Sequence, residues 1–439
     1  MTVVAVSRPA LQTVRLPRLL AGPAGLRTVG LLEHERLHGP LQLRAPGDHA
    51  RRLSQSRLVD LIEWSGLTGR GGAGFPTGRK MRSVAAAKGK PVVVANGAEG
   101  EPASAKDKLL LSRSPHLVLD GISLAAYAVG ADRAFLAVHD QEARLGRNLE
   151  AAAAARTAAG IDPIPIEVVG IPSRYVSSEQ SAIVRFLNEG IALPTFSPPR
   201  THERGYHGRP TLVNNAETLA HVALIARHGD RWFRSAGAPQ APGTMLVTVS
   251  GAVARPGVYE IEAGMPIGAV LTSAGDLIER CGAILVGGYF GAWLRMDVAW
   301  QLPLTHRDTR SAGGALGAGV IVALPETSCG LAETARVVRY LADETAGQCG
   351  PCVFGLPALA DALADLAYHG EPGAARRAVR LAGLAAGRGA CKHPDGVAQL
   401  ARSALDAFYL DAARHEERGP CYGIGQPPVL PLPGDMTVW

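Results

Sequence analysis

Lysine, cysteine and aromatic residues are all scarce in this chain of 439 residues. Only six of its 45 basic residues are lysines, so arginine carries the net charge of +6. Six cysteines are too few for a disulfide framework and favour a metal site or buried thiols. No basic run is interleaved with aromatics, which argues against a nucleic-acid partner.

No apolar run reaches the ~18 residues that cross a bilayer, and residues 1–26 lack the continuous apolar stretch of a signal peptide. We therefore expect a cytoplasmic protein without direct membrane insertion.

The first half of the chain has the pattern of an α/β domain. Residues 1–50 show no periodicity and are expected to form an irregular N-terminal extension. From 51 to 237, strand-like and helix-like runs alternate, as is typical of a mostly parallel sheet with helices on it. The strand-like runs are Val92–Ala95, Ala134–Val138 and Ile164–Val169, and the helix-like runs are Leu117–Val129, Leu145–Ala158, Ser181–Asn188 and Glu217–Arg227.

The second half divides into a hairpin-containing domain, 238–312, and a helical part, 313–415, before a tail at 416–439. Two short apolar runs flank Arg255-Pro256-Gly257, which predicts a β-hairpin, and a short helix is expected over Ile267–Ser273. After a Gly-rich patch the rest is expected to be helical, because Ala and Leu recur at helical spacing, and an antiparallel bundle is the natural packing. The expected helices are Leu331–Glu344, Pro357–Leu366, Ala374–Leu384 and Gly396–Leu410.

A Gly-rich stretch, Gly69–Lys80, holds five glycines in ten residues and ends in two cations. Glycines let the backbone approach a ligand closely, so that several N–H groups can point at one phosphate, and Lys80 would add a point charge. By itself such a loop could equally be a plain turn.

Three further segments carry polar groups suited to a ligand. The segment Asn96–Pro102 contains Glu99 and Glu101 directly after a strand-like run. Asn214 and Asn215 can donate and accept hydrogen bonds, although an Asn-rich turn with a helix cap explains them too. In the segment Tyr175–Ala182, Ser177 and Ser178 could cap the helix that follows, which does not exclude ligand contact.

Taken in this order, these segments resemble the NADH-oxidising flavoprotein component of respiratory complex I and its relatives in soluble hydrogenases and formate dehydrogenases. The resemblance covers about residues 55–415. It implies a Rossmann-like flavin- and NADH-binding α/β domain, then a β-grasp module of the SLBB type, then a C-terminal helical bundle with an iron–sulfur motif. In this family the Gly-rich loop holds the dinucleotide, and the acidic and Asn-containing segments line FMN.

The resemblance also assigns candidate residues. Glu101 and Tyr175 are the candidates for a catalytic role. The candidate cofactor-binding residues are Gly69, Arg70, Gly71, Gly72, Gly74, Phe75, Lys80, Asn96, Glu99, Glu101, Tyr175, Glu179, Gln180, Asn214, Asn215 and Thr218.

The cysteine pattern resembles the family's iron–sulfur motif, with one ligand missing. Cys349, Cys352 and Cys391 match three of the four cysteines that hold a [4Fe–4S] cluster, whereas Ala346 stands at the position of the first. We therefore expect a [3Fe–4S] or a labile [4Fe–4S] cluster, unless Cys421 or, less favourably, His393 supplies the fourth ligand. Without the resemblance, the Cys-x-x-Cys pair could be buried or redox-active thiols. Cys281 and Cys329 are expected to be small core residues.

Three positions depart from the family on the nicotinamide side. Ser83 and Arg200 replace phenylalanines that stack on the nucleotide, while Phe75 is retained. Gln180 replaces a glutamate that lies near the adenosine ribose and disfavours a 2′-phosphate. With that repulsion removed, and with Arg79 and Arg200 adding positive charge, NADPH is expected to be accepted comparably with NADH. Alternatively, Gln180 only hydrogen-bonds the ribose hydroxyls.

The resemblance implies an FMN-dependent NAD(P)H dehydrogenase. Electrons would pass from NAD(P)H through FMN and an iron–sulfur centre to a partner electron carrier, ferredoxin-like or another redox subunit. The arginine excess suits an acidic partner, although codon composition explains it as well. The alternative is a degenerate homologue that keeps the fold as a non-catalytic docking scaffold, which the substitutions at Ser83, Gln180, Arg200 and Ala346 favour.

Overall fold

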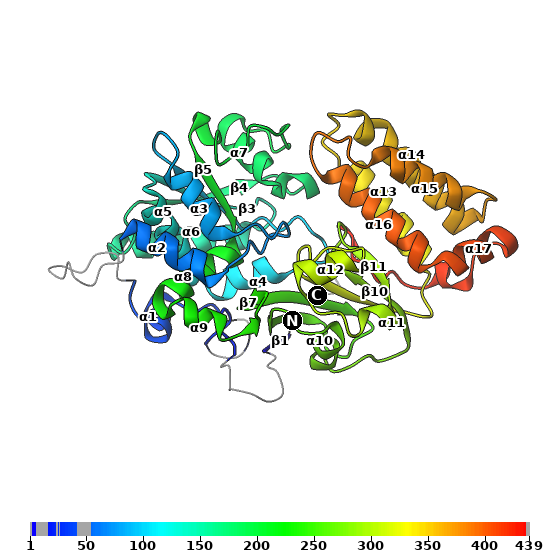
Figure 1. The fold of residues 1–439 in the computed structure, drawn as a ribbon, viewed down its shortest axis with the longest axis horizontal. Coiled ribbons are helices and arrows are strands. Elements are labelled where there is room, and N and C mark those ends of the chain that lie inside the picture. Colours follow the sequence, from blue (N-terminus) through cyan, green and yellow to red (C-terminus); the bar gives the residue numbers. More distant parts are fainter. Residues whose placement is uncertain (1, 6–15, 23–24, 26, 42–53, 436–439) are drawn as a thin grey trace.

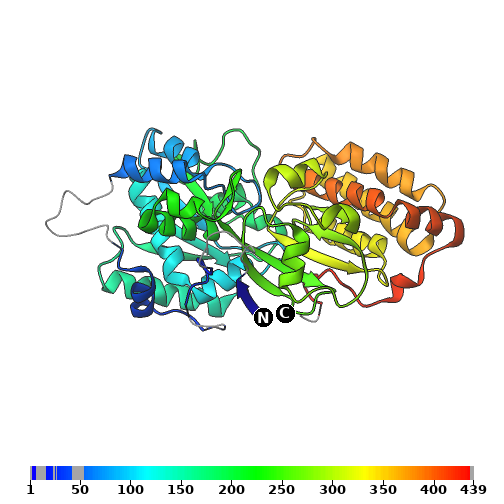
Figure 2. The ribbon, with the colours of Figure 1, turned by 60° about the horizontal axis from the view of Figure 1, so that its bottom comes forward.

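The computed structural model describes residues 2–5, 16–22, 25, 27–41 and 54–435. In Figure 1 an α/β part lies on the left, a bundle of helices at the upper right, and a second sheet beneath the bundle. Figure 2, turned about the horizontal axis, again shows the α/β part at one end and the bundle at the other.

The first sheet has four parallel strands with helices on both faces. The strands lie in the order β4, β3, β2, β5. Val93 and Leu136 pack toward the helices α5 (Pro115–Val129) and α8 (Ala216–His228), whereas Val94 and Phe135 pack toward α7 (Gln180–Glu189). Because both faces are covered, β2 and β3 are apolar almost throughout, which is why the sequence reveals them. The strands are β2 (Val92–Asn96), β3 (Arg133–His139), β4 (Ile166–Ile171) and β5 (Thr211–Asn215).

The helices expected for this part are all present. β5 has no counterpart among the predicted strands, because its apolar run is only Leu212-Val213 between polar residues. The helices are α2 (Gln55–Ser65), α3 (Thr77–Ala85), α4 (Lys106–Arg113), α5 (Pro115–Val129), α6 (Ala143–Ala158), α7 (Gln180–Glu189) and α8 (Ala216–His228).

The second sheet has six strands in the order β1, β9, β8, β12, β10, β11. The predicted hairpin is β8 and β9, which pair antiparallel, and α10 spans the predicted Ile267–Ser273. β12 lies in the stretch expected to be helical, so that expectation is wrong there. A six-residue apolar run buried on both sides has no period that separates strand from helix. The strands are β1 (Thr2–Ala5), β8 (Thr244–Gly251), β9 (Gly257–Glu262), β10 (Cys281–Val286), β11 (Ala292–Arg295) and β12 (Val320–Pro325).

The helical bundle follows β12 and matches the predicted helices closely. The predicted helix Gly396–Leu410 is in fact two, because Phe408 leaves the helical conformation (φ −109°, ψ 29°) between α16 and α17. The bundle helices are α13 (Gly330–Asp343), α14 (Leu356–Ala364), α15 (Ala374–Ala385), α16 (His393–Ala407) and α17 (Tyr409–Arg418).

One continuous helical stretch, Pro351–His369, is long and apolar enough to cross a membrane by length and composition alone. It combines α14 with a π-helical turn at each end. Asp361 and Asp365 interrupt it and pair with Arg339 and Arg377 of neighbouring helices, and its apolar residues Leu356, Leu359 and Leu363 are buried in the core of the bundle. These contacts are those of a core helix in the bundle.

The N-terminal extension is not irregular throughout, contrary to expectation. It contains β1, which pairs in parallel with β9, and a helix, α1 (Leu31–His38). The backbone N–H groups of residues 18–20 all donate to the carboxylate of Glu260 in β9, at 2.8–3.2 Å. A mostly polar helix and isolated backbone contacts of this kind leave no periodic signal in the sequence.

Candidate functional site

The predicted motifs meet where the parallel strands end. Asn96 at the end of β2 pairs in register with Asn215 at the end of β5, and the acidic segment and α8 follow these two residues. Gly71 of the Gly-rich loop lies so close that a Cβ atom there would be 3.3 Å from Cβ of Asn215. The carboxyl edge of an open parallel sheet is the usual place for a ligand.

A cavity of about 850 Å³ opens at this edge. All sixteen candidate cofactor-binding residues line it. Cys391, Phe290 and His393 line it as well. The cavity therefore reaches from the Gly-rich loop of the α/β part to the start of α16 in the bundle.

Glycines let the walls of the cavity pack more closely than side chains would permit. Gly74 has a left-handed backbone (φ +64°), and a Cβ there would lie 2.5 Å from the ring of His306. At Gly100 a Cβ would lie 2.5 Å from Oγ of Ser178. The loops thus present bare backbone to the cavity, as a phosphate or a flat ring requires.

Arg70 anchors the Gly-rich loop. Its backbone N–H donates to Oγ1 of Thr218 at 2.9 Å, and its guanidinium donates to the carbonyl of Thr244 at 3.0 Å. Its Nε lies 4.0 Å from a carboxylate oxygen of Glu217. The side chain is buried, and this burial lowers its pKa below the ordinary value. Arg70 is therefore engaged with the protein, and Lys80 is the freer cation of this loop.

Lys80 lies on α3 with its ammonium group at the cavity wall. Nζ donates to the carbonyl of Val213 at 2.5 Å and to Oε1 of Gln180 at 3.4 Å. Burial lowers the pKa of Lys80 to about 8, with Glu179 opposing the shift. A partly buried, incompletely paired cation of this kind is suited to a phosphate.

The two glutamates of the acidic segment have different surroundings. Glu99 accepts the hydroxyl of Ser104 and the N–H of Lys108 at the start of α4, so it fixes that helix. Glu101 accepts the N–H of Tyr289 at 2.7 Å and the hydroxyl of Tyr175 at 3.2 Å. Burial raises the pKa of Glu101 to about 7, so this carboxyl can hold or release a proton near neutrality.

A buried charge cluster beneath the cavity was missed from the sequence. Nζ of Lys106 lies 2.9 Å from carboxylate oxygens of both Asp107 and Glu217. Burial opposes the charge of Lys106, but the two carboxylates raise its pKa above the usual value. Asn215 donates to Asp107 at 2.7 Å and caps α8 by accepting the N–H of Glu217 at 3.0 Å. One feature of the sequence could have indicated this cluster: Lys106 and Lys108, two of only six lysines, come directly after the acidic segment.

Asn214 and Asn215 differ in their partners. Asn215 caps α8, which is the role that the sequence allowed as an alternative to ligand binding. Asn214 instead lines the cavity, and its buried Nδ2 has no hydrogen-bond partner among the described residues. An orphaned donor at a cavity wall fits an acceptor on a bound molecule.

The helix cap after Tyr175 is not the one expected. Glu179 caps α7, accepting N–H groups of Ser181 and Ala182 at 2.8 and 3.3 Å. Ser177 is buried and donates to the carbonyls of Pro172 and Arg174. The serines therefore do not cap α7, because the glutamate side chain reaches its first N–H groups from the residue preceding the helix.

One wall of the cavity carries an aromatic residue that no motif in the sequence predicts. Phe75 and Phe196 both line the cavity and are 49% and 68% exposed. Arg200 lines it too, whereas Ser83 and Arg79 are exposed on α3 and are not among the lining residues. Phe196 lies in a loop far from Phe75 in sequence, so no local pattern relates the two. Of the cations considered for the nucleotide, Lys80 and Arg200 therefore line the cavity and Arg79 does not.

Cys349, Cys352 and Cys391 converge beside the cavity. The thiol of Cys349 accepts the backbone N–H groups of Ala390 and Cys352, and these bonds, together with the Cys352 thiol, lower its pKa despite partial burial. Burial, followed by the neighbouring Cys349, raises the pKa of Cys352 to about 12. Three gathered thiols fit three of the metal ligands of an iron–sulfur cluster.

The two residues considered for the fourth ligand lie differently. Cys421 lies beside Cys329 and His415. His393 begins α16, and its Nε2 lies 2.8 Å from the carbonyl of Leu341. Its buried Nδ1 has no partner within the described part of the chain, and its ring packs on Tyr175.

Comparisons with known proteins agree with this arrangement. Residues 62–224 match the family described as Nuo51 FMN-binding domain. Residues 246–289 match the SLBB domain, and residues 332–415 match the NADH-ubiquinone oxidoreductase-F iron-sulfur binding region. The chain thus combines an FMN-binding domain, an SLBB module and an iron–sulfur binding region.

Relatives and a solved structure extend the likeness to most of the chain. An F subunit of the NADH-quinone oxidoreductase of Rhizobium meliloti is 31% identical over 377 residues, which are 83% of this chain and 90% of that protein. The alpha subunit of the NAD-reducing hydrogenase HoxS of Cupriavidus necator is 31% identical over 78% of this chain and 59% of its own length. A crystal structure of an NAD⁺-reducing [NiFe]-hydrogenase in the H2-reduced state superposes with a TM-score of 0.75 at 30% identity, over 84% of this chain and 63% of that longer chain.

Proposed function

Because the chain belongs to the family of the NADH-quinone oxidoreductase F subunits, we propose that it is the NADH-oxidising component of a complex I-type or hydrogenase-type assembly. One observation carries this proposal. Cys391 lines the same cavity as the Gly-rich loop and the acidic segment. A flavin held by those segments would therefore share a wall with an iron–sulfur cluster, so that no further carrier is needed between them.

The candidate residues would divide the work of binding. When bound, FMN accepts hydride from the nicotinamide, and the iron–sulfur cluster carries single electrons. The bare backbone at Gly71 and Gly72, with Lys80, would hold phosphate groups, and Asn214 would donate its orphaned Nδ2 to the flavin. Tyr175 and Phe290 would exclude water at the bundle side. Cys349, Cys352 and Cys391 would hold the cluster.

Glu101 and Tyr175 would act on protons at the cavity floor. A carboxyl with a pKa of about 7 exchanges a proton near neutral pH with little cost. Tyr175 donates to the same oxygen that accepts the N–H of Tyr289, so it fixes the orientation of the carboxyl. We assign both residues to positioning and to charge balance beside the flavin.

The function also requires a partner. We propose that electrons leave to another protein, either a ferredoxin-like carrier or a redox subunit, and that the protein acts in the cytoplasm. In this proposal residues 51–237 bind FMN and nucleotide, residues 238–312 form the SLBB-like connection, and residues 313–415 hold the cluster. The net charge of +6 suits an acidic partner.

Cofactor analysis of the purified chain tests the proposal. We expect a yellow-brown protein that releases FMN in acid and reduces ferricyanide with NADH. Gly71→Val, which fills the space beside Asn215, should abolish flavin retention. Gly146→Val is the matched control, because a Cβ at Gly146 of α6 meets no atom within 4 Å. A colourless protein that takes up no FMN would overturn the proposal and leave the scaffold role, which the missing thiolate at Ala346 favours.

A further inference from the structure

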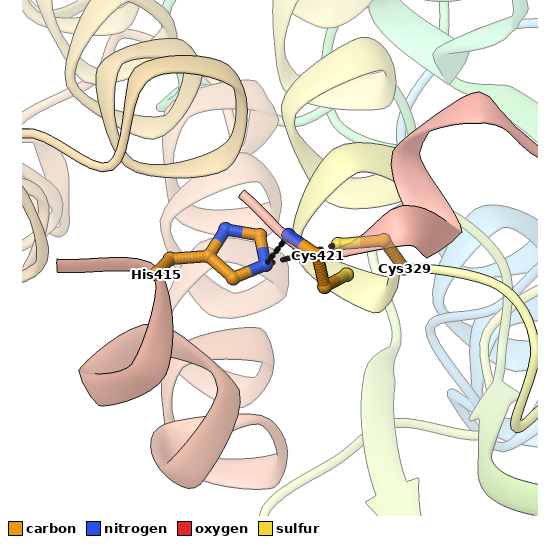
Figure 3. A group of neighbouring side chains, drawn as sticks. All are labelled: Cys329, His415 and Cys421. Atoms are coloured by element: carbon orange, nitrogen blue, oxygen red, sulfur yellow. Dashed lines mark hydrogen bonds between the residues drawn. The ribbon is translucent and has the colours of Figure 1, made fainter. Parts of the chain in front are cut away.

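A second group of metal-ligating side chains lies at the other end of the bundle from the predicted cluster. It consists of Cys329, His415 and Cys421 (Figure 3). Their ligand atoms all lie within 4.8 Å of one another, and Sγ of Cys329 is 3.9 Å from Nε2 of His415. Cys329 directly precedes α13, His415 lies in the last turn of α17, and Cys421 follows that helix.

The two groups of thiols are separate. His393, two residues after Cys391, contacts the carbonyl of Leu341 near the last turn of α13. Cys329 precedes the first turn of the same helix. With a rise of about 1.5 Å per residue, the 14 residues of α13 separate the two ends by roughly 20 Å. One metal centre cannot use both groups.

The imidazole of His415 is oriented as a metal ligand requires. Nδ1 lies 3.2 Å from the carbonyl of Leu366, so we assign the proton to Nδ1, which leaves a lone pair on Nε2. A backbone carbonyl in this position fixes the ring and the tautomer of many metal-bound histidines. Nε2 accepts the N–H of Cys421 at 3.1 Å and contacts the thiol of Cys329, so a metal ion would take the place of both contacts.

The spacing of the three ligand atoms fits a tetrahedral ion. Zinc bound at the usual lengths of ~2.3 Å to sulfur and ~2.0 Å to nitrogen holds its ligand atoms roughly 3.4–3.8 Å apart. The observed 3.9 Å between Cys329 and His415 is close to that range. Cys329 also accepts the N–H of Ala332 at the start of α13. Two thiols and an imidazole are soft ligands that select zinc over magnesium or calcium.

We propose that Cys329, His415 and Cys421 bind a zinc ion, distinct from the iron–sulfur cluster, with a water molecule completing the tetrahedron at the partly exposed side of Cys421. The ion would join the end of α17 to the start of α13. Its role would be structural, since it fixes the point from which the C-terminal tail leaves the last helix.

The tail that starts at this point leads to the cavity. Beyond Cys421, the N–H of Leu430 donates to Glu333 at 2.8 Å. The carbonyl of Pro431 accepts the hydroxyl of Tyr289, whose N–H is bonded to Glu101. Zinc binding would therefore stabilise a tail that supports the floor of the cavity.

Metal analysis of the purified holoprotein, grown with zinc and iron, tests this proposal. We expect about one zinc per chain, as for other sites with three protein ligands, in addition to the iron. Cys329→Ser and His415→Ala should lose the zinc and keep the iron, and Cys349→Ser should do the reverse. Cys281→Ser is the matched control, because Cys281 is a buried cysteine of β10 outside both groups, and it should keep both metals.

A second measurement does not depend on the folding of the variants. Removing zinc from the wild type with a chelator should expose the thiols of Cys329 and Cys421 to alkylation and raise hydrogen exchange over residues 421–435. Zinc-free wild type, a native disulfide between Cys329 and Cys421, or unchanged alkylation after chelation would overturn the proposal.

Discussion

Tyr175 donates its hydroxyl to Oε2 of Glu101 at 3.2 Å, and the same oxygen accepts the backbone N–H of Tyr289 at 2.7 Å. Three parts of the chain thus meet at one buried carboxyl: the acidic segment after β2, the loop before α7, and the loop after β10. A side chain at Gly288 would collide with this carboxylate, since its Cβ would lie 2.6 Å from Oε2. The contact links the acidic segment at the cavity to the SLBB-type module.

The raised pKa of Glu101 makes stability depend on pH. Burial moves this pKa from 4.5 to about 7. As pH rises between these values, the unfolded chain loses the proton and the folded chain keeps it, so stability falls from about pH 5 to about pH 7 and then levels off. The loss is on the order of 1–3 kcal/mol. Glu101→Gln should remove this pH-dependent loss of stability. The difference between the Tm of the variant and that of the wild type should therefore shift in favour of the variant as pH rises toward 8.

The measurement is thermal unfolding of the cofactor-stripped protein across this pH range. Glu189→Gln is the control, because Glu189 lies exposed at the end of α7 and should leave the pH profile unchanged. Parallel Tm profiles for the wild type and Glu101→Gln would show that the carboxyl titrates normally.

Lys80 should supply charge to a bound phosphate. Lys80→Met should raise the KM for NADH by about ten- to a hundredfold, the worth of a hydrogen bond to a charged group. Because burial lowers the pKa of Lys80 to about 8, its charge is lost as pH rises through that value. The wild-type KM should therefore rise between about pH 7 and 9, and that of the variant should not.

Lys88 provides the control for this experiment. It lies beyond the end of α3, away from the cavity lining, and Lys88→Met should change neither the KM nor its pH dependence. Equal KM values for Lys80→Met and the wild type would remove Lys80 from the nucleotide site.

The sequence predicted which loops meet at the cavity better than it predicted the parts around them. Ligand loops at the ends of parallel strands need glycine, asparagine and acidic residues at set places, and these leave local motifs. The cluster of Lys106, Asp107 and Glu217 joins residues about 110 positions apart, so no local pattern contains it. Phe196 is likewise related to Phe75 only through the fold. β12 was missed because burial on both faces removes the period that marks a strand.

Phe196 should replace the stacking lost at Ser83 and Arg200. It and Phe75 are exposed at the cavity, and an aromatic pair is worth about 0.5–1.5 kcal/mol. Phe196→Ala should raise the KM for NADH roughly two- to tenfold. Phe354→Ala, at a similarly exposed phenylalanine outside the cavity lining, should have no effect. If both variants match the wild type, Phe196 makes no contact with the nucleotide.

Gln180 should allow the protein to use NADPH as well as NADH. Its Oε1 lies 3.4 Å from Nζ of Lys80, and Arg200 lines the same cavity, so a 2′-phosphate would meet two cations and no carboxylate at position 180. We expect kcat/KM for NADPH to be at least comparable with that for NADH. Gln180→Glu should shift the ratio toward NADH by about ten- to a hundredfold.

The ratio of the two kcat/KM values decides between phosphate recognition and simple bonding to ribose hydroxyls. A wild-type preference for NADH of about a hundredfold, on the order of 2.7 kcal/mol, would rule out the expectation. Gln180→Met tests the hydrogen bonds alone, because it removes them without adding charge. If Gln180 acts by lacking a charge, this variant should reduce kcat/KM for NADH and NADPH by the same factor.

Because Ala346 supplies no thiolate, the iron–sulfur cluster should be a three-iron form or an unstable four-iron form. Cys349, Cys352 and Cys391 converge, whereas Cys421, considered as the fourth ligand, lies beside Cys329 and His415. One iron of a four-iron cluster then lacks a thiolate, and electron paramagnetic resonance should show a [3Fe–4S] signal or a four-iron signal that disappears in air. Ala346→Cys should restore a stable [4Fe–4S] signal, and Ala346→Ser, with a weaker oxygen ligand, should not. Cys421→Ser should give the same spectrum as the wild type.

An air-stable four-iron cluster in the wild type would show instead that another group binds the fourth iron. His393 is then the first residue to replace, because its buried Nδ1 has no partner among the described residues and it directly follows the Cys391-Lys392 pair.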